Sequence, residues 1–274
     1  MAHESQTART AALSQVMGIV NVTPDSFSDG GRWASTDAAV DRAMQLVADG
    51  ADVLDIGGES TRPGAEPVGE GEEIDRVAPV IAGVRARWGG PISVDTMKPA
   101  VARAAVAAGA TMWNDVTALG HAPDSAAVAA ELGCEVVLMH MKGEPRTMQA
   151  DPQYGDVVAE VRDYLLSRAE AAMAAGAARE KIWLDPDIGF GKMLDHNMAL
   201  TARLGELEEE FAQAVASGSE FRLRAAQSKL ASVQQWLDRA NAVMKKLSDA
   251  GLDDDSWRLA QSIGQRQSRL LRMA

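Results

Sequence analysis

Between residue 16 and about residue 204, short apolar runs alternate with longer stretches in which alanine and polar residues mix. The short runs are apolar almost throughout, which is typical of strands buried on both faces of a parallel sheet. Several of the longer stretches end at a glycine, which indicates the C-cap of a helix. The pattern predicts strands at 16–21, 52–56, 92–95, 111–114, 135–140 and 182–185, and helices at 36–49, 71–88, 98–108, 123–132 and 156–175.

Six strand–helix units in this order predict an α/β fold with a parallel sheet, either a TIM-barrel-like (β/α) barrel or a doubly wound sheet. From about residue 204 the apolar positions follow helical spacing alone. We therefore divide the chain into a flexible N-terminus (1–15), a βα portion (16–204) and a tail of amphipathic helices (205–274). Six units cannot close as eight do, so we expect an incomplete barrel whose open edges the tail helices cover, or a tail that forms a separate bundle.

Polar side chains collect where the apolar runs end. In a parallel barrel the carboxyl ends of the strands converge on one mouth, and the active site lies there. One such residue is often only a helix cap, but the same placement on six runs favours a shared site. For His140 the alternatives are a side chain in this mouth and a packed, hydrogen-bonded side chain. The polar residues are Asn21, Asp55, Glu59, Asp95, Asn114, Asp115, His140 and Asp185.

Composition narrows the classes of function. A formal net charge of −12 argues against nonspecific nucleic-acid binding, although a local site can still bind a small anion. The single cysteine, Cys134, excludes an intrachain disulfide and is expected in the core. No two His or Cys residues have the spacing of zinc ligands. No apolar run is long enough to cross a bilayer and the N-terminus lacks a signal-peptide segment, so we expect a cytoplasmic protein.

Three of the strand-end residues, Asp95, Asn114 and Asp185, would form a wall of carboxylate, amide and carboxylate. Such a wall complements a flat heterocycle whose edge carries neighbouring N–H donors, much as Asp and Asn read the edges of bases. The three residues alone do not say which heterocycle. The glycine-rich run 55–65 contains Thr61 and Arg62, which suit an anion if the run is not merely a surface turn.

Six motifs, in this order and spacing, carry a resemblance to a known family. Residues 16 to about 204 of the 274-residue chain resemble dihydropteroate synthase. The resemblance implies a (β/α)8 barrel, usually a homodimer, in the folate pathway. It would join 6-hydroxymethyl-7,8-dihydropterin pyrophosphate to p-aminobenzoate, release pyrophosphate and be a target of sulfonamides. The motifs are MGIVNVTPDSFSDGG, DIGGESTRPGA, SVDTMKP, WNDVTAL, VVLMHMKGEPRTMQ and LDPDIGFGK.

The resemblance also implies a role for each matching residue. Asp95, Asp185 and Asn21 would be the catalytic residues, with Asn21 holding Mg²⁺ and pyrophosphate. The two carboxylates would stabilise the cationic pterin methylene that remains when pyrophosphate leaves. Among the substrate-binding residues, Asn114 would bind the pterin together with Asp95 and Asp185, and Met139 and Phe190 would line the slot that holds it. Thr61 and Arg62 would close over the site, and Phe27 and Pro63 would flank the aminobenzoate. Lys192 would also bind substrate.

The chain departs from the family pattern in two respects. Residues 205–274 contain neither the Ser-Arg-Lys type motif nor the Arg-x-His motif with which the last two family strands end. Asp187 stands where the LDPG turn usually has glycine, and Asp tolerates a positive φ less well than glycine does. Two alternatives therefore stay open. One is a catalytically impaired, truncated or recombined pterin-binding scaffold whose tail binds a partner or self-associates, and the other is a related pterin-dependent methyltransferase.

Overall fold

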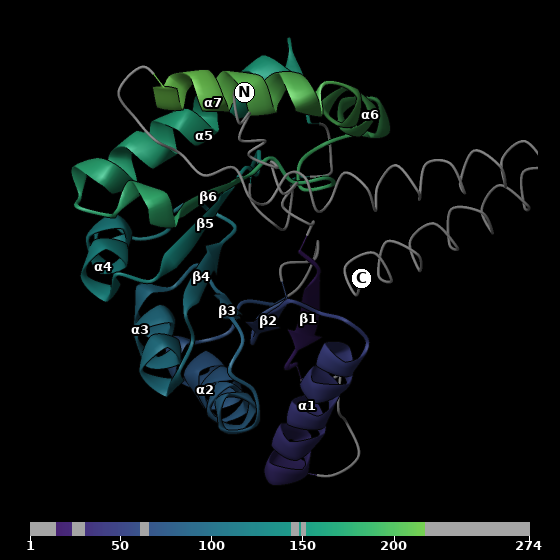
Figure 1. The fold of residues 1–274 in the computed structure, drawn as a ribbon, viewed down its shortest axis with the longest axis vertical. Helices are drawn as coiled ribbons and strands as arrows, with labels where there is room; N and C mark the ends of the chain where they lie inside the picture. The colour runs from purple at the N-terminus through teal and green to yellow at the C-terminus, as the bar shows by residue number, and fades with distance from the viewer. Residues whose placement is uncertain (1–14, 24–30, 61–65, 144–147, 149–151, 217–274) are drawn as a thin grey trace, which may run out of the picture.

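Six parallel strands form one open sheet, and each pairs with its neighbours along the chain in the order β1-β2-β3-β4-β5-β6 (Figure 1). The computed structural model describes residues 15–23, 31–60, 66–143, 148 and 152–216. Within these residues, β1 and β6 each pair on one side only. The strands are β1 (Met17–Asn21), β2 (Val53–Gly57), β3 (Ile92–Asp95), β4 (Met112–Asp115), β5 (Glu135–Met139) and β6 (Ile182–Asp185).

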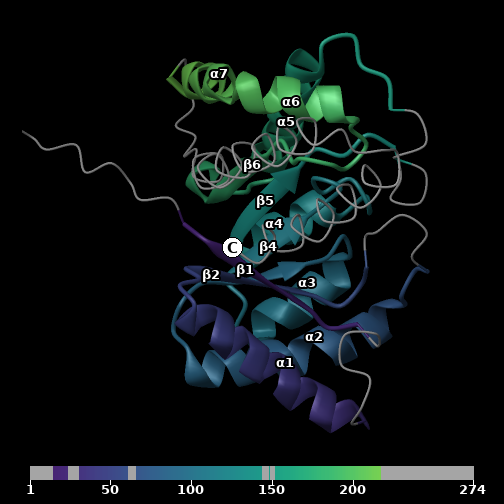
Figure 2. The ribbon, with the colours of Figure 1, turned by 90° about the vertical axis from the view of Figure 1, so that its right-hand side faces the viewer.

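Helices follow the strands in turn and lie in an arc around the outside of the sheet (Figure 1). From the side, α1 and α2 lie at one end of this arc and α6 and α7 at the other (Figure 2). The alternation confirms a TIM-barrel-like α/β fold that is incomplete. The helices are α1 (Gly31–Ala48), α2 (Glu70–Arg87), α3 (Pro99–Ala108), α4 (Ser125–Leu132), α5 (Val157–Ala174), the 3-10 turn η2 (Arg179–Lys181), α6 (Leu194–Ala202) and α7 (Leu204–Ala216).

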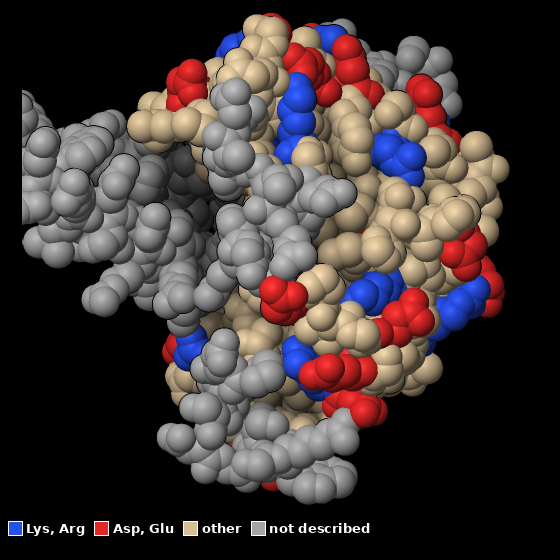
Figure 3. Space-filling model, turned by 180° about the vertical axis from the view of Figure 1, so that it is seen from behind, with Lys and Arg blue, Asp and Glu red and all other residues tan. Residues whose placement is uncertain are grey.

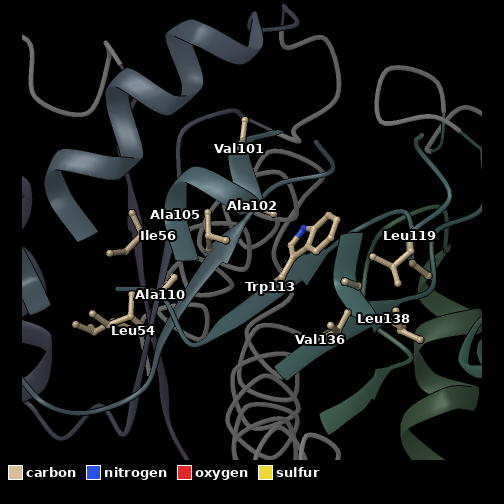
Figure 4. Packing of buried hydrophobic residues seen from close by; sticks show 14 of the residues in the cluster. Leu54, Ile56, Val101, Ala102, Ala105, Ala110, Trp113, Leu119, Val136 and Leu138 are labelled. Atoms are coloured by element: carbon tan, nitrogen blue, oxygen red, sulfur yellow. The ribbon is translucent and has the colours of Figure 1, made fainter. Parts of the chain in front are cut away.

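The core lies between the sheet and these helices. Apolar side chains from successive strands meet there, and Trp113, Leu54, Ile56 and Leu138 are fully buried (Figure 4). The Trp113 indole N–H donates a 2.7 Å hydrogen bond to the carbonyl oxygen of Thr96, so the N–H group keeps a hydrogen-bond acceptor although the ring is buried. Burial of this kind is why the strands are apolar nearly throughout, and why the apolar runs located each strand to within one residue.

Local sequence chemistry sets the helix ends. Pro99 opens α3, where its missing N–H costs nothing, and Gly109 ends this helix with φ 115°. Asp156 caps α5 by accepting hydrogen bonds from the backbone N–H groups of Val158 and Ala159. Cys134 is half-buried against the core, as expected, and burial raises the pKa of its thiol.

The first part of the tail is helical, as predicted. Leu207 and Phe211 of α7 are buried against the core. Arg162 of α5 donates to the Glu210 carboxylate at 3.0 Å, which ties α7 to α5. The remaining helices predicted for 217–274 lie outside the described residues, as do all but the last residue of the flexible N-terminus predicted for 1–15.

Acidic and basic side chains mix on the surface shown in Figure 3. Among the helices described, none combines the length and apolar character that a membrane crossing requires.

Candidate active site

The carboxyl ends of β2, β3 and β4 bring together the first part of the predicted polar wall. The strand register places Asp95 beside Gly57 on one side and Asn114 on the other. The Asp95 side chain lies over Gly57: a Cβ there would lie 3.5 Å from the Asp95 Cβ and Oδ2 atoms. Asn114 donates from Nδ2 to Oδ2 of the buried Asp55 at 3.2 Å. Asp95 is paired with Gly57 and with Asn114 in the register, so these three residues share one face of the sheet. Asp55 lies two residues before Gly57 on β2, so it lies on the same face.

Asp185 stands at the end of β6, and the turn that follows fixes its carboxylate. Its Oδ1 accepts a 2.9 Å hydrogen bond from the backbone N–H of Asp187. Asp187 has φ 45°, as its place at the usual glycine position suggested, and its Oδ2 accepts from the Phe190 N–H at 3.1 Å. The carboxylate of Asp187 thus stabilises the turn in which its own backbone is strained.

An apolar cluster lies next to Asp185. Met139, which is paired with Asp185 in the β5–β6 register, packs with Phe190, and both are buried. The structure therefore joins the two residues expected to line a slot. It adds Val116 and Met148, which sequence reasoning missed. Val116 follows directly after the Asn114-Asp115 pair, and only this position at a strand end could have indicated that it lies in the cluster.

His140 and Lys192 connect the end of β5 to the loop after β6. Lys192 is buried, and its ammonium donates to the carbonyl oxygens of His140 (3.1 Å) and Phe190 (3.2 Å). The His140 ring packs edge-on against Tyr164 at 5.1 Å between ring centroids, and lies 6.1 Å from Tyr154. Burial, with the nearby charge of Lys192, lowers the pKa of His140 to about 3. Of the two positions open to His140, the structure shows the packed one, although its Nδ1 has no hydrogen-bond partner among the described residues.

The other candidate residues are less fully placed. Asn21 is exposed at the end of β1, opposite Gly57. Phe27, Thr61, Arg62 and Pro63 lie outside the described residues. No three His, Cys, Asp or Glu side chains are grouped to hold a metal ion in the parts of the chain described.

The arrangement can hold a flat polar ring. Carboxylate and amide oxygens at the strand ends are acceptors that suit an N–H edge, and the buried Met139 and Phe190 form an apolar cluster beside Asp185. An apolar surface with a few fixed polar groups is the usual make-up of a small-molecule pocket.

Comparison with known proteins agrees with this chemistry. A family model described as "Pterin binding enzyme" matches residues 17–247. The chain belongs to the pterin-binding enzyme family. Among curated members, it is 50% identical over 191 residues to the dihydropteroate synthase of Escherichia coli (strain K12), which is 70% of this chain and 67% of that protein. It is 45% identical over 193 residues to the dihydropteroate synthase of Synechocystis sp., with 70% and 67% of the two chains covered.

Solved structures of this pterin-binding family share the fold. The Xanthomonas albilineans dihydropteroate synthase with 4-aminobenzoic acid is 52% identical and superposes with a TM-score of 0.66 over 72% of this chain and 69% of that one. The same enzyme in complex with 7,8-dihydropteroate is 48% identical, with a TM-score of 0.64 over 72% and 70%. The dihydropteroate synthase of Stenotrophomonas maltophilia with active site-bound imidazole is 44% identical and covers 82% of each chain, with a TM-score of 0.66.

Proposed function

We propose that this chain is a dihydropteroate synthase. It condenses 6-hydroxymethyl-7,8-dihydropterin pyrophosphate with p-aminobenzoate to give 7,8-dihydropteroate and pyrophosphate. One observation carries the proposal: Asp95 and Asn114 lie side by side at the strand ends, and Asp185 is fixed beside the apolar cluster of Met139 and Phe190. Curated relatives at about half identity bear this enzyme's name, and related structures hold 4-aminobenzoic acid and 7,8-dihydropteroate.

The pterin binds by its N–H edge. Asp95, Asn114 and Asp185 accept its hydrogen bonds, and the ring lies between apolar side chains of the slot. The Asp187 N–H holds the Asp185 carboxylate in one orientation before the pterin arrives. Groups fixed in advance lose little further freedom on binding, and this favours affinity.

The reaction breaks the bond between the pterin methylene carbon and the pyrophosphate oxygen. Pyrophosphate leaves with the electron pair, the amine nitrogen of p-aminobenzoate bonds to the methylene carbon, and the amine loses a proton. Positive charge develops on the pterin methylene as pyrophosphate departs. The carboxylates of Asp95 and Asp185 stabilise this charge electrostatically.

Asn21 binds the pyrophosphate end, Thr61 and Arg62 close over the site, and Phe27 and Pro63 flank the aminobenzoate. The resemblance of their motifs supports these roles. Mg²⁺ usually keeps several waters and takes only one or two protein ligands besides the substrate's phosphates. Asn21, exposed at the end of β1, fits such a minimal role because it offers one amide oxygen. When bound, the ion would neutralise charge on the pyrophosphate. Family resemblance also supports a homodimer, which light scattering of the purified chain tests.

Formation of dihydropteroate tests the proposal. The full chain is incubated with the pterin pyrophosphate, p-aminobenzoate and Mg²⁺, and product is separated by chromatography. Asp95→Asn should lower kcat/KM at least about 100-fold, because it removes a charge that stabilises the transition state. Asp124→Asn, the same change at an exposed residue before α4, should leave kcat/KM within about twofold. Equal rates for wild type and Asp95→Asn would refute the assignment, and pterin binding without turnover would favour the non-catalytic alternative.

A further inference from the structure

A buried ammonium lies between two carboxylates beside the proposed pterin site. Lys98, directly before α3, donates from Nζ to Glu59 Oε2 and, at 2.5 Å, to Glu73 Oε2. Lys98 is buried, Glu73 of α2 is fully buried, and the Glu59 side chain is 11% exposed. Burial lowers the pKa of Lys98, but its hydrogen bonds to Glu59 and Glu73 outweigh this effect, so the pKa is raised and the ammonium stays charged. We call these three residues the buried triad.

The buried triad joins the ends of two strands that form the polar wall. Glu59 lies two residues after Gly57, which ends β2, and Lys98 lies three residues after Asp95, which ends β3. Gly57 and Asp95 are themselves neighbours in the sheet. The Lys98–Glu59 contact therefore bridges the two chain segments immediately beyond the place where Asp95 lies over Gly57.

Other contacts hold the β2 side of this bridge. The Arg76 guanidinium donates to the Gly58 carbonyl oxygen at 2.7 Å. A side chain at position 58 would force its neighbours to shift, because a Cβ there would lie 2.8 Å from Val77 Cγ1 and 3.0 Å from Glu73 Cγ. Helix α2 thus packs against the chain between Gly57 and Glu59. Glu73 takes part in this packing and also accepts a hydrogen bond from Lys98 in the buried triad.

Hydrogen bonds also link the segment after β3, which contains Thr96 and Lys98, to the polar wall. The backbone N–H of Lys98 donates to Thr96 Oγ1 at 3.2 Å. The backbone N–H of Thr96 donates to the Asn114 carbonyl oxygen at 3.1 Å. A short chain of contacts therefore runs from the ammonium of Lys98 to the backbone of Asn114, the second residue of the wall.

We propose that Lys98 is a positioning residue for pterin recognition, which acts by bracing the Glu59 and Asp95 segments so that the wall keeps its spacing. The inference rests on the proposed function, because it concerns the same pterin site. Buried charges gain little net stability once their desolvation is counted. The hydrogen bonds of a buried network do, however, hold the segments that they join in one arrangement, and the Lys98 ammonium bonds to both carboxylates, although Glu73 Oε1 has no partner among the described residues. The triad thus fixes the position of Asp95 without touching the pterin.

Two matched variants separate positioning from general stability. Glu59→Gln and Glu73→Gln each replace one carboxylate on the same ammonium with its isosteric amide. Both should lower the free energy of unfolding by similar amounts, measured by urea denaturation of the full chain. Only Glu59 is joined through the chain to Gly57, so Glu59→Gln should weaken binding of 6-hydroxymethylpterin about tenfold, whereas Glu73→Gln should weaken it no more than about threefold. Binding is followed by the fluorescence of the pterin.

Further variants complete the test. Lys98→Met should weaken pterin binding at least as much as Glu59→Gln, and Lys98→Arg, which keeps the charge, should restore part of the affinity. Arg103→Ala removes the exposed pair with Glu131 and should not change pterin affinity. If Glu59→Gln and Glu73→Gln weaken pterin binding equally, the positioning role is wrong while the proposed function stands. If the wild-type chain does not bind 6-hydroxymethylpterin at all, the proposed function fails as well.

Discussion

Lowering the pH from about 7 to about 4 should destabilise this protein through the buried imidazole of His140. Burial, with the charges of Lys192 and Lys142, lowers the pKa of His140 from 6.5 to about 3. In the unfolded chain His140 therefore becomes protonated near pH 6.5, whereas in the folded chain it becomes protonated only near pH 3. The stability that the neutral ring contributes is present above pH 6.5 and is lost as the pH falls toward 3. The difference between the two pKa values corresponds to a contribution of at most about 5 kcal/mol to the free energy of unfolding.

That amount is large beside the 5–15 kcal/mol or so by which typical domains are stable. Other groups also titrate in this range. The pKa of Glu160, which faces the same cluster, is lowered by its hydrogen bond to Lys142, so it too loses stabilisation in acid. The pKa of Asp115 is raised by burial, so it acts in the opposite sense. Tyr154, whose pKa burial raises to about 12, does not titrate here. A variant at position 140 alone therefore isolates the contribution of the imidazole.

The assay is urea denaturation, followed by tryptophan fluorescence, at several pH values between about 7 and about 4. His140→Phe keeps an aromatic ring against Tyr164 and removes the titrating group. Between about pH 7 and about pH 4, the free energy of unfolding of His140→Phe should fall by at least about 2 kcal/mol less than that of wild type. His121→Gln, at an exposed residue, should follow wild type. Parallel stability curves for wild type and His140→Phe would refute the reasoning.

Two further predictions concern the loop after β6. Asp187→Gly should change the free energy of unfolding by no more than about 1 kcal/mol, because it relieves the strain of the positive φ but removes the acceptor for the Phe190 N–H. Asp187→Ala keeps the strain and also removes the acceptor, so it should lower the free energy of unfolding by about 2 kcal/mol. Urea denaturation measures both, and equal losses would contradict the prediction. Lys192→Met leaves the carbonyl oxygens of His140 and Phe190 without its ammonium and should cost about 2–4 kcal/mol. It should also weaken pterin binding about tenfold, and unchanged affinity would exclude a link between this contact and the slot.

Much of the fold follows from local patterns in the sequence. Strands buried on both faces must be apolar throughout, so β3 and β6 match their expected ranges. Helix ends were less certain: α1 begins at Gly31 rather than near residue 36, and α6 is not among the helices that the pattern predicts. A helix as short as α6 spans too few turns for apolar periodicity to define it.

The candidate site was predictable where strand ends or motifs carry it and not where it depends on contacts across the fold. Asp95, Asn114 and Asp185 stand at strand ends, and a positive φ at Asp187 was considered only because glycine is usual at its position. The pairing of Lys98 with Glu59 spans 39 residues and that with Glu73 spans 25. Neither local propensity nor periodicity encodes such pairs, because they arise only when separate segments are packed together.

The most direct test of the central claim is equilibrium binding of 6-hydroxymethylpterin to the full chain and to its Asp185→Asn variant, followed by pterin fluorescence. Hydrogen bonds to charged groups contribute about 1.5–3 kcal/mol, so the account predicts saturable binding that Asp185→Asn weakens roughly 10- to 100-fold. Urea denaturation of the variant serves as the control for folding. No saturable binding to the wild-type chain, or equal affinity in a folded Asp185→Asn variant, would contradict the account.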